Sequence, residues 1–194
     1  VLLEPLDTEF IFAASVPLAV EGGFDSLRTD GTGSMRLPSV HYARIEYKAW
    51  SELSGSWSED PVYRQYTDAS YINESPEVSE LKALGASITA GIKTPIGKAA
   101  AMERFFKDNY AYSLDAPSSG RRLLEDFLLR TRSGYCEHYA TAMVMLLRQQ
   151  GIPARLVTGF LHGEWNNLGN YLIVRQQDSH SWVEAYMEGS GWAR

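Results

Sequence analysis

The sequence predicts an α+β protein in two parts: a small all-β unit over residues 1–75, then helices and an antiparallel sheet over residues 76–194. Three observations predict this class. Before about residue 75 the apolar residues come in short runs broken by glycine, serine, aspartate and proline, which is typical of strands and turns. After it they recur at three- and four-residue spacing, which indicates helix faces. From residue 155 they form strand-like runs between turn-forming residues, which indicates antiparallel strands.

The β unit is predicted from its most regular run and from its turns. Residues 41–50 alternate between apolar and polar side chains, as a half-buried strand does. Gly22-Gly23 and the segment 30–33 supply residues that tolerate positive φ, which tight turns need. The first third of the chain therefore indicates short strands joined by turns.

Helix ends in the second part are marked by capping residues. Thr94 followed by Pro95 predicts a helix start, and the helix should run to about Asn109. Another helix should begin near Cys136 and continue to residue 150, where Gly151 ends it. Helix faces are also expected around residues 78–88 and 123–128, and three strands at 155–161, 170–176 and 180–187, with a hairpin turn at 189–191.

Composition excludes several classes of function. The formal charge of -6 and the pI near 5.2 argue against binding nucleic acid, which is usually contacted by a basic face. No apolar run reaches the roughly 18 residues of a membrane helix, so this piece is expected to be soluble.

The chain starts without methionine and stops in what reads as a strand, as a segment cut from a longer protein would.

The single cysteine, Cys136, rules out an intrachain disulfide framework and a four-cysteine zinc site. A lone cysteine is often only a small buried apolar residue. This one, however, lies in the predicted first turn of an amphipathic helix. There the free backbone N–H groups and the helix dipole favour a thiolate, and they can also stabilise an oxyanion formed on an attacked carbonyl.

A thiolate nucleophile needs a histidine to carry protons, and the chain has four histidines. His41 is expected to be a strand residue of the β unit and His162 a loop residue. His138 follows the cysteine by two positions on the same helix, so it points away from the sulfur. His180 opens the last long strand, and it alone has a plausible path back to the helix start.

Three blocks resemble the transglutaminase core in order and spacing: Gly134 to Ala142, Gly151 to Phe160, and His180 to Tyr186. The resemblance implies a papain-like fold in which Cys136 is the nucleophile and His180 the base. It implies acyl transfer on protein or peptide carboxamides, with no cofactor and no metal. With a β unit in front, the chain resembles the periplasmic domain of a bacterial membrane-anchored member of this family.

The family's third catalytic residue is an aspartate on the strand after the histidine. Here the hairpin turn at 189–191 starts a return strand, so the residues facing His180 should lie just beyond Arg194. Asp178 is expected in a turn and Glu184 on the solvated side of its strand, which makes both poor substitutes. The segment is therefore expected to be an impaired enzyme, since the orienting carboxylate is worth about 10⁴ in turnover in a related triad.

Alternatives remain open at this point. The same site could act as a cysteine peptidase or amidase on cell-wall or protein substrates, or the fold could be a silent peptide-binding module. A metal site built from Cys136, His138 and His180 has too few ligands for known zinc patterns. Trp165, in the segment 163–169, is a candidate for lining a substrate groove. The oligomeric state cannot be predicted from these patterns.

Overall fold

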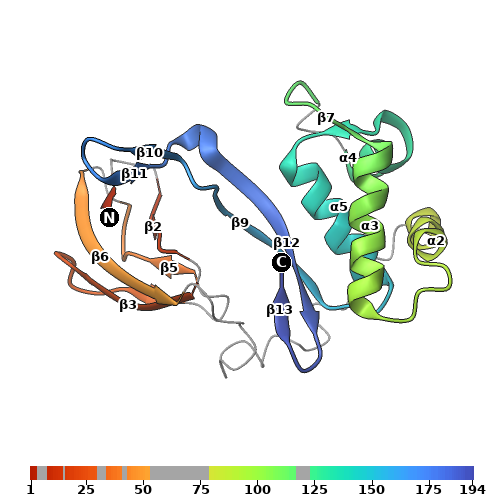
Figure 1. Ribbon diagram of the computed structural model, residues 1–194, viewed down its shortest axis with the longest axis horizontal. Helices are drawn as coiled ribbons and strands as arrows, with labels where there is room; N and C mark the ends of the chain where they lie inside the picture. Colours follow the sequence, from red (N-terminus) through yellow and green to blue (C-terminus); the bar gives the residue numbers. More distant parts are fainter. Residues whose placement is uncertain (4–7, 15, 30–33, 41–42, 53–78, 117–122) are drawn as a thin grey trace. The chain divides into compact units, whose positions relative to one another are not determined.

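A computed structural model of the chain describes residues 1–3, 8–14, 16–29, 34–40, 43–52, 79–116 and 123–194 (Figure 1). The chain divides into two compact units, Val1–Tyr66 and Thr67–Arg194. Each unit is described by itself below. The boundary predicted at residue 75 lies outside the described residues and stays a prediction.

The first unit contains only strands in its described residues. They form two antiparallel sheets, ordered β1-β6-β3 and β2-β5-β4. The strands are β1 (Leu2–Leu3), β2 (Phe10–Ile11), β3 (Val16–Gly22), β4 (Arg28–Thr29), β5 (Met35–Arg36) and β6 (Ile45–Glu52). Tyr47 is buried in a small core with Ile11, and its hydroxyl donates to the Phe12 carbonyl at 2.8 Å. The all-β prediction holds for these residues.

Helices follow in the second unit, and their ends match the capping signals. They are α2 (Ser79–Ile88), α3 (Pro95–Asn109), α4 (Leu123–Glu125) and α5 (Cys136–Gln149). The Thr94 side chain accepts the Gly97 N–H at 3.3 Å and caps α3. Gly151, just past α5, has φ +73°, a conformation that glycine adopts without strain. Both predicted helix boundaries are confirmed.

One helical segment differs from the prediction. Apolar spacing at 123–128 indicates an ordinary helix, but α4 continues as a π-helix over Asp126–Thr131 and ends at Arg132 with φ 48°. The Arg132 N–H bonds the Phe127 carbonyl at 3.1 Å, and the Tyr110 hydroxyl donates to the Leu128 carbonyl at 2.6 Å. Phe127 and Leu128 are both buried as a result. Sequence spacing does not reveal this wider turn because a distant tyrosine supports it.

The main sheet has the order β13-β12-β9 and is antiparallel throughout. Its strands are β9 (Ala154–Phe160), β12 (Ser179–Met187) and β13 (Gly191–Ala193). The predicted middle strand does not join it. Instead β11 (Tyr171–Ile173) pairs with β10 (Glu164–Asn166), because the Asn166 side chain accepts the N–H groups of Leu168 and Gly169 and closes a tight hairpin. A 3₁₀ helix, η3 (Gln176–Asp178), leads into β12.

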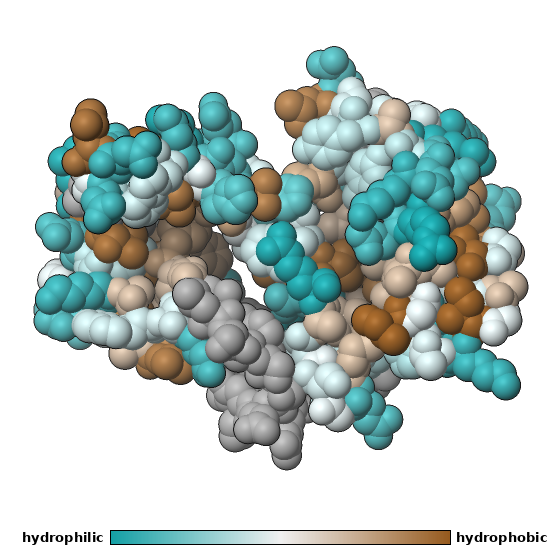
Figure 2. Space-filling view, in the orientation of Figure 1, coloured by the Kyte–Doolittle hydropathy of each residue, from teal (hydrophilic) through white to brown (hydrophobic). Residues whose placement is uncertain are grey.

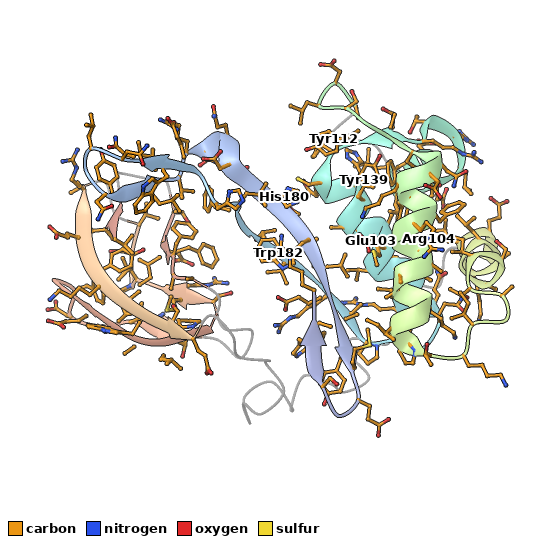
Figure 3. All side chains as sticks on the ribbon, in the orientation of Figure 1. Glu103, Arg104, Tyr112, Tyr139, His180 and Trp182 are labelled. Atoms are coloured by element: carbon orange, nitrogen blue, oxygen red, sulfur yellow. The ribbon has the colours of Figure 1, made fainter. Side chains whose placement is uncertain are left out.

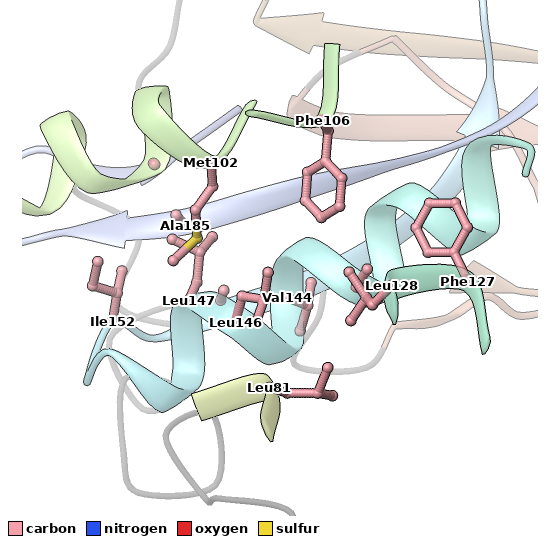
Figure 4. Close-up of a cluster of buried hydrophobic side chains, with 13 residues drawn as sticks. Leu81, Met102, Phe106, Phe127, Leu128, Val144, Leu146, Leu147, Ile152 and Ala185 are labelled. Carbon is pink, nitrogen blue, oxygen red and sulfur yellow. The ribbon is translucent and has the colours of Figure 1, made fainter. Parts of the chain in front are cut away.

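Helix α5 lies at the centre of this unit and packs against β9, β12 and the other helices. Figure 4 shows the shared core, in which Leu146 and Leu147 of α5 meet Ala185 of β12. Val183 and Met187 pack against the same cluster. Since side chains alternate along a strand, these residues form one face of β12, and that face packs against the helices. No helix among the described residues is long and apolar enough to cross a bilayer.

The opposite face of β12 carries a buried ion pair. Glu184 is 6% exposed and accepts two hydrogen bonds from the Arg155 guanidinium, at 2.6 and 2.9 Å. The Arg155 guanidinium also lies 4.3 Å above the ring of Trp192. The prediction of a solvated Glu184 is therefore wrong. A charge paired to a cross-strand arginine and covered by an indole can be buried, although its residue type usually stays exposed.

Breaking this pair should destabilise the protein strongly. Glu184→Ala removes both hydrogen bonds that the buried Arg155 guanidinium donates to Glu184, so we expect a loss of about 3–5 kcal/mol in the free energy of unfolding, measured in urea. Glu103→Ala is the matched control, because Glu103 pairs with Lys107 at 2.6 Å on the solvent side of α3. Its loss should stay below about 1 kcal/mol. Glu103 lies in the C-terminal half of α3, where the surface is largely hydrophilic (Figure 2). Equal losses in the two variants would contradict a structural role for the buried pair.

Candidate active site

The start of α5 is built by the residues just before it. Gly134, in β8 (Ser133–Gly134), is buried, and a Cβ atom there would lie 2.9 Å from side-chain atoms of His138 and Phe127. Only glycine therefore fits without displacing them. Tyr135 is the N-cap and Cys136 the first helical residue. Cys136 is partly exposed rather than buried.

His138 is part of the scaffold under Cys136. It is 7% exposed, and its Nδ1 accepts the backbone N–H of Tyr135 at 3.4 Å. Its ring packs edge-on to Tyr135 with centroids 4.3 Å apart, and lies 5.5 Å from the ring of Phe127. The sequence left open whether His138 is structural or exposed, and in the structure it is buried. The ring ties the N-cap to the first turn and thereby fixes the direction in which the helix begins.

His180 is the second residue of β12 and is partly exposed. Its cross-strand partner on β9 is Gly159. A Cβ at Gly159 would lie 2.8 Å from the ring of Trp182, so the glycine makes room for that indole. Alternation along β12 places His180, Trp182 and Glu184 on one face of the sheet. The imidazole thus has an aromatic neighbour along its own strand and no side chain across from it on β9.

The topology places Cys136 and His180 at the same end of the unit. Helix α5 has 14 residues, about 21 Å of helix, and β9 has 7, about 23 Å of strand. A short connection joins the two, and they pack together, so they run in opposite directions. Because β12 is antiparallel to β9, its first residues lie toward the N-terminal end of α5. Figure 3 labels His180 on β12 and Tyr139 on the first turns of α5.

The two elements are together, but the two side chains are not hydrogen-bonded. Within the described residues neither the Cys136 sulfur nor the His180 ring has a hydrogen-bond partner. The backbone N–H of Cys136 is likewise unpaired in that part of the chain, as expected at a helix start. A thiol, an imidazole and a free amide N–H at one end of the unit are the groups that acyl transfer through a thioester requires.

The remaining histidines, Asp178 and Trp165 were also considered as site residues from the sequence. His162 is exposed and follows the end of β9, as predicted for a loop residue. His41 lies outside the described residues. Asp178 ends η3, and its Oδ2 accepts the backbone N–H of Arg175 at 2.6 Å. Trp165 is 52% exposed in β10, opposite Leu172, and its role in a groove stays a prediction.

No carboxylate among the described residues is hydrogen-bonded to the ring of His180. Strand β13 runs back along β12 as predicted, but its residues pair only with residues 185–187. The position across from His180 on that side lies further along the ladder than the described residues extend. The acid expected beyond Arg194 therefore stays a prediction. In the described part of the chain no group of three or more histidine, cysteine, aspartate or glutamate side chains is placed to hold a metal ion.

Sequence reasoning missed an aromatic layer beside Cys136. Tyr139 follows the cysteine by three residues, so both lie on one face of α5. Its ring packs edge-on against Phe106 and Phe127 and stacks on Tyr112, with centroids 6.3 Å apart and an interplanar angle of 28°. Tyr112 belongs to β7 (Ala111–Tyr112), which pairs in parallel with β8. The i+3 spacing of Cys136 and Tyr139 was the one signal of this layer in the sequence.

The tyrosines of this layer should make the protein sensitive to alkali. Burial raises the pKa of Tyr110 above 10.0, against a smaller lowering by the charge of Arg132. Burial also raises the pKa of Tyr139, and Tyr112 adds to that rise. A folded-state pKa above the unfolded value gives stability that is complete below pH 10 and lost as the pH rises further.

Urea unfolding between pH 8 and pH 11.5 measures this loss. The free energy of unfolding should fall above pH 10, and the fall should be shallower in Tyr110→Phe. At pH 8 the same variant should lose about 1 kcal/mol, since its hydroxyl no longer bonds the Leu128 carbonyl. Identical slopes in the two proteins would mean that burial of this hydroxyl does not control the alkaline limit.

A helical layer on an antiparallel sheet, with a cysteine as the first residue of the central helix and a histidine as the second residue of the long strand, is a papain-like α+β arrangement. A sequence model of the transglutaminase-like superfamily matches residues 82–194. The chain belongs to the transglutaminase-like superfamily, as its three sequence blocks predicted.

Individual relatives agree with this assignment. A protein-glutamine gamma-glutamyltransferase of Pseudomonas aeruginosa is 34% identical over 203 aligned residues, which cover 99% of this chain and 28% of that protein. The crystal structure of the periplasmic domain of TgpA from Pseudomonas aeruginosa superposes with a TM-score of 0.83 at 30% identity, covering 99% of this chain and 66% of that one. A structure from Cytophaga hutchinsonii shares the fold, with a TM-score of 0.54 at 18% identity, 98% of this chain and 68% of that one.

These matches confirm the α+β fold and the predicted likeness to a periplasmic domain of this family. They extend across both units, so the β unit in front of the core is part of what is shared. The chain spans about a quarter of the length of the glutamyltransferase that it matches, at 28%.

Proposed function

We propose that this chain is the catalytic domain of a protein-glutamine gamma-glutamyltransferase that faces the periplasm, in a protein anchored in the inner membrane. The observation that carries the proposal is the position of Cys136, partly exposed at the first residue of a central helix that packs against the strand opened by His180. The likeness to a named glutamyltransferase along almost the whole chain supports the choice of reaction.

In the first half-reaction the Cys136 thiolate attacks the carboxamide carbon of a glutamine side chain. A C–S bond forms, and the oxyanion is held by the free N–H at the start of α5. The C–N bond then breaks, and ammonia leaves with a proton from the His180 imidazolium. A thioester and a neutral imidazole remain.

In the second half-reaction a lysine amine attacks the thioester carbon. The imidazole of His180 takes the proton from the amine, the C–S bond breaks, and the thiolate returns with an isopeptide product. Water in place of the amine gives glutamate. Hydrogen bonds between catalytic groups are often long before substrate binds, so the absence of a Cys136–His180 bond in the free protein is compatible with this cycle.

The test is an assay of ammonia release from N-blocked glutamine peptides, with and without a primary amine. It uses the 194-residue chain and a chain continued by about twenty residues, enough for a return strand of ordinary length. We expect release from the longer chain, with amine incorporated in proportion, and release roughly 10⁴-fold slower from the shorter one. Cleavage of the peptide backbone instead of ammonia release would show a peptidase. No turnover of either kind would favour a silent binding module.

A further inference from the structure

The stacked pair Tyr112 and Tyr139, called here the tyrosine platform, has no part in the reaction just described. The two rings come from segments that are distant in sequence. Tyr139 is on the face of α5 that carries Cys136, and Tyr112 is brought there by the pairing of β7 with β8. Residues of β8 end two positions before the cysteine. Tyr139 therefore lies one helical turn from Cys136, and Tyr112 lies on the strand paired with the segment that leads into Cys136.

Support for the platform comes from beneath. The Tyr139 ring has edge contacts with Phe106, Phe127 and Tyr110, at centroid distances of 5.8, 5.1 and 6.3 Å. Phe106 and Phe127 are buried at 3% and 2% exposure. Tyr139 is thus held rigidly, whereas Tyr112 on top of it is 62% exposed. An exposed aromatic ring backed by a buried aromatic cluster presents a flat apolar surface with little freedom left to lose on binding.

The backbone next to the platform offers a second contact. The N–H groups of Ala111 and Ser113 bond the carbonyls of Arg132 and Gly134, each at 2.8 Å. Because N–H groups alternate along a strand, the N–H and carbonyl of Tyr112 point to the opposite edge of β7. In the described part of the chain no strand pairs with that edge. An extended peptide can add to such an edge through main-chain hydrogen bonds.

From this geometry we infer that the tyrosine platform and the free edge of β7 bind the acyl donor as an extended peptide, with an aromatic side chain beside the reactive glutamine stacked on Tyr112. The inference rests on the proposed function for the identity of the glutamine. It adds the substrate class: unfolded or loop segments in which an aromatic residue adjoins the glutamine. Leu114, two residues after Tyr112 in this chain, is 76% exposed and adds to the exposed apolar surface.

Binding is tested in the Cys136→Ala protein, so that the result does not depend on turnover. Two blocked hexapeptides carry a central glutamine flanked either by phenylalanine or by serine on both sides, and fluorescence anisotropy gives their Kd values. We expect the phenylalanine peptide to bind about 3- to 10-fold more tightly, the range of one aromatic stacking contact. Tyr112→Ala in the same background should remove this preference, and Tyr112→Phe should keep it.

Ile96→Ala is the control, because Ile96 is exposed at the far end of α3, about 20 Å of helix from β7. It should leave both Kd values unchanged. The inference is overturned if the phenylalanine preference is absent or survives Tyr112→Ala. Failure of the proposed function would look different: the protein with Cys136 intact would release no ammonia even from blocked Gln-Gly, a donor without aromatic neighbours, whatever the peptides bind.

Discussion

Replacing Cys136 by alanine is expected to abolish ammonia release and amine incorporation, with a loss on the order of 10⁶-fold, as seen when a nucleophile is removed from a related triad. The physical reason is that no other cysteine exists in the chain to form the thioester. The measurement is turnover of blocked glutamine peptides by the chain continued past Arg194, compared between the two proteins.

The fold should be untouched by this change. Cys136 is partly exposed at a helix start, so the free energy of unfolding should change by less than about 1 kcal/mol. Comparing turnover with the free energy of unfolding therefore distinguishes a loss of catalysis from a loss of folding. Turnover that persists in Cys136→Ala with the same dependence on amine would remove the thioester from the mechanism.

Replacing His180 by glutamine should cost nearly as much turnover, again on the order of 10⁶-fold, because nucleophile and base act as one unit. Glutamine keeps polar atoms at the site but cannot carry the proton to the departing ammonia. The loss should appear in kcat while peptide binding stays the same. Adding Cys136→Ala to His180→Gln should cost little more than either change alone.

His162→Gln is the matched control, since His162 is an exposed histidine in the loop after β9. We expect it to turn over like the unaltered protein. If His162→Gln lost activity and His180→Gln kept it, the catalytic base would be His162 and not His180. Equal additive losses from Cys136→Ala and His180→Gln would argue against a shared step.

Local chemistry made much of the fold predictable. Thr94-Pro95 and Gly151 mark helix ends through capping and positive φ, effects that operate within a few residues. The α5 boundary placed Cys136 correctly at a first turn. The transglutaminase blocks added the papain-like fold and the expected roles of Cys136 and His180, which periodicity alone does not give.

Features that depend on distant contacts were not predictable in this way. The π-helix at Asp126–Thr131 is supported by the hydroxyl of Tyr110, and the burial of Glu184 depends on Arg155 across the sheet. The pairing of β10 with β11 depends on one asparagine side chain. In the candidate site, Tyr112 reaches Tyr139 only through the parallel β7–β8 pairing. Each of these joins residues that a local pattern treats separately.

The pairing of sulfur and imidazole is tested most directly by the rate at which iodoacetamide alkylates Cys136, the one cysteine, as a function of pH. We predict that His180→Gln slows alkylation at pH 6 by 10-fold or more, because an adjacent imidazolium favours the thiolate form of the sulfur. An alkylation rate at pH 6 that does not respond to His180→Gln would contradict the account.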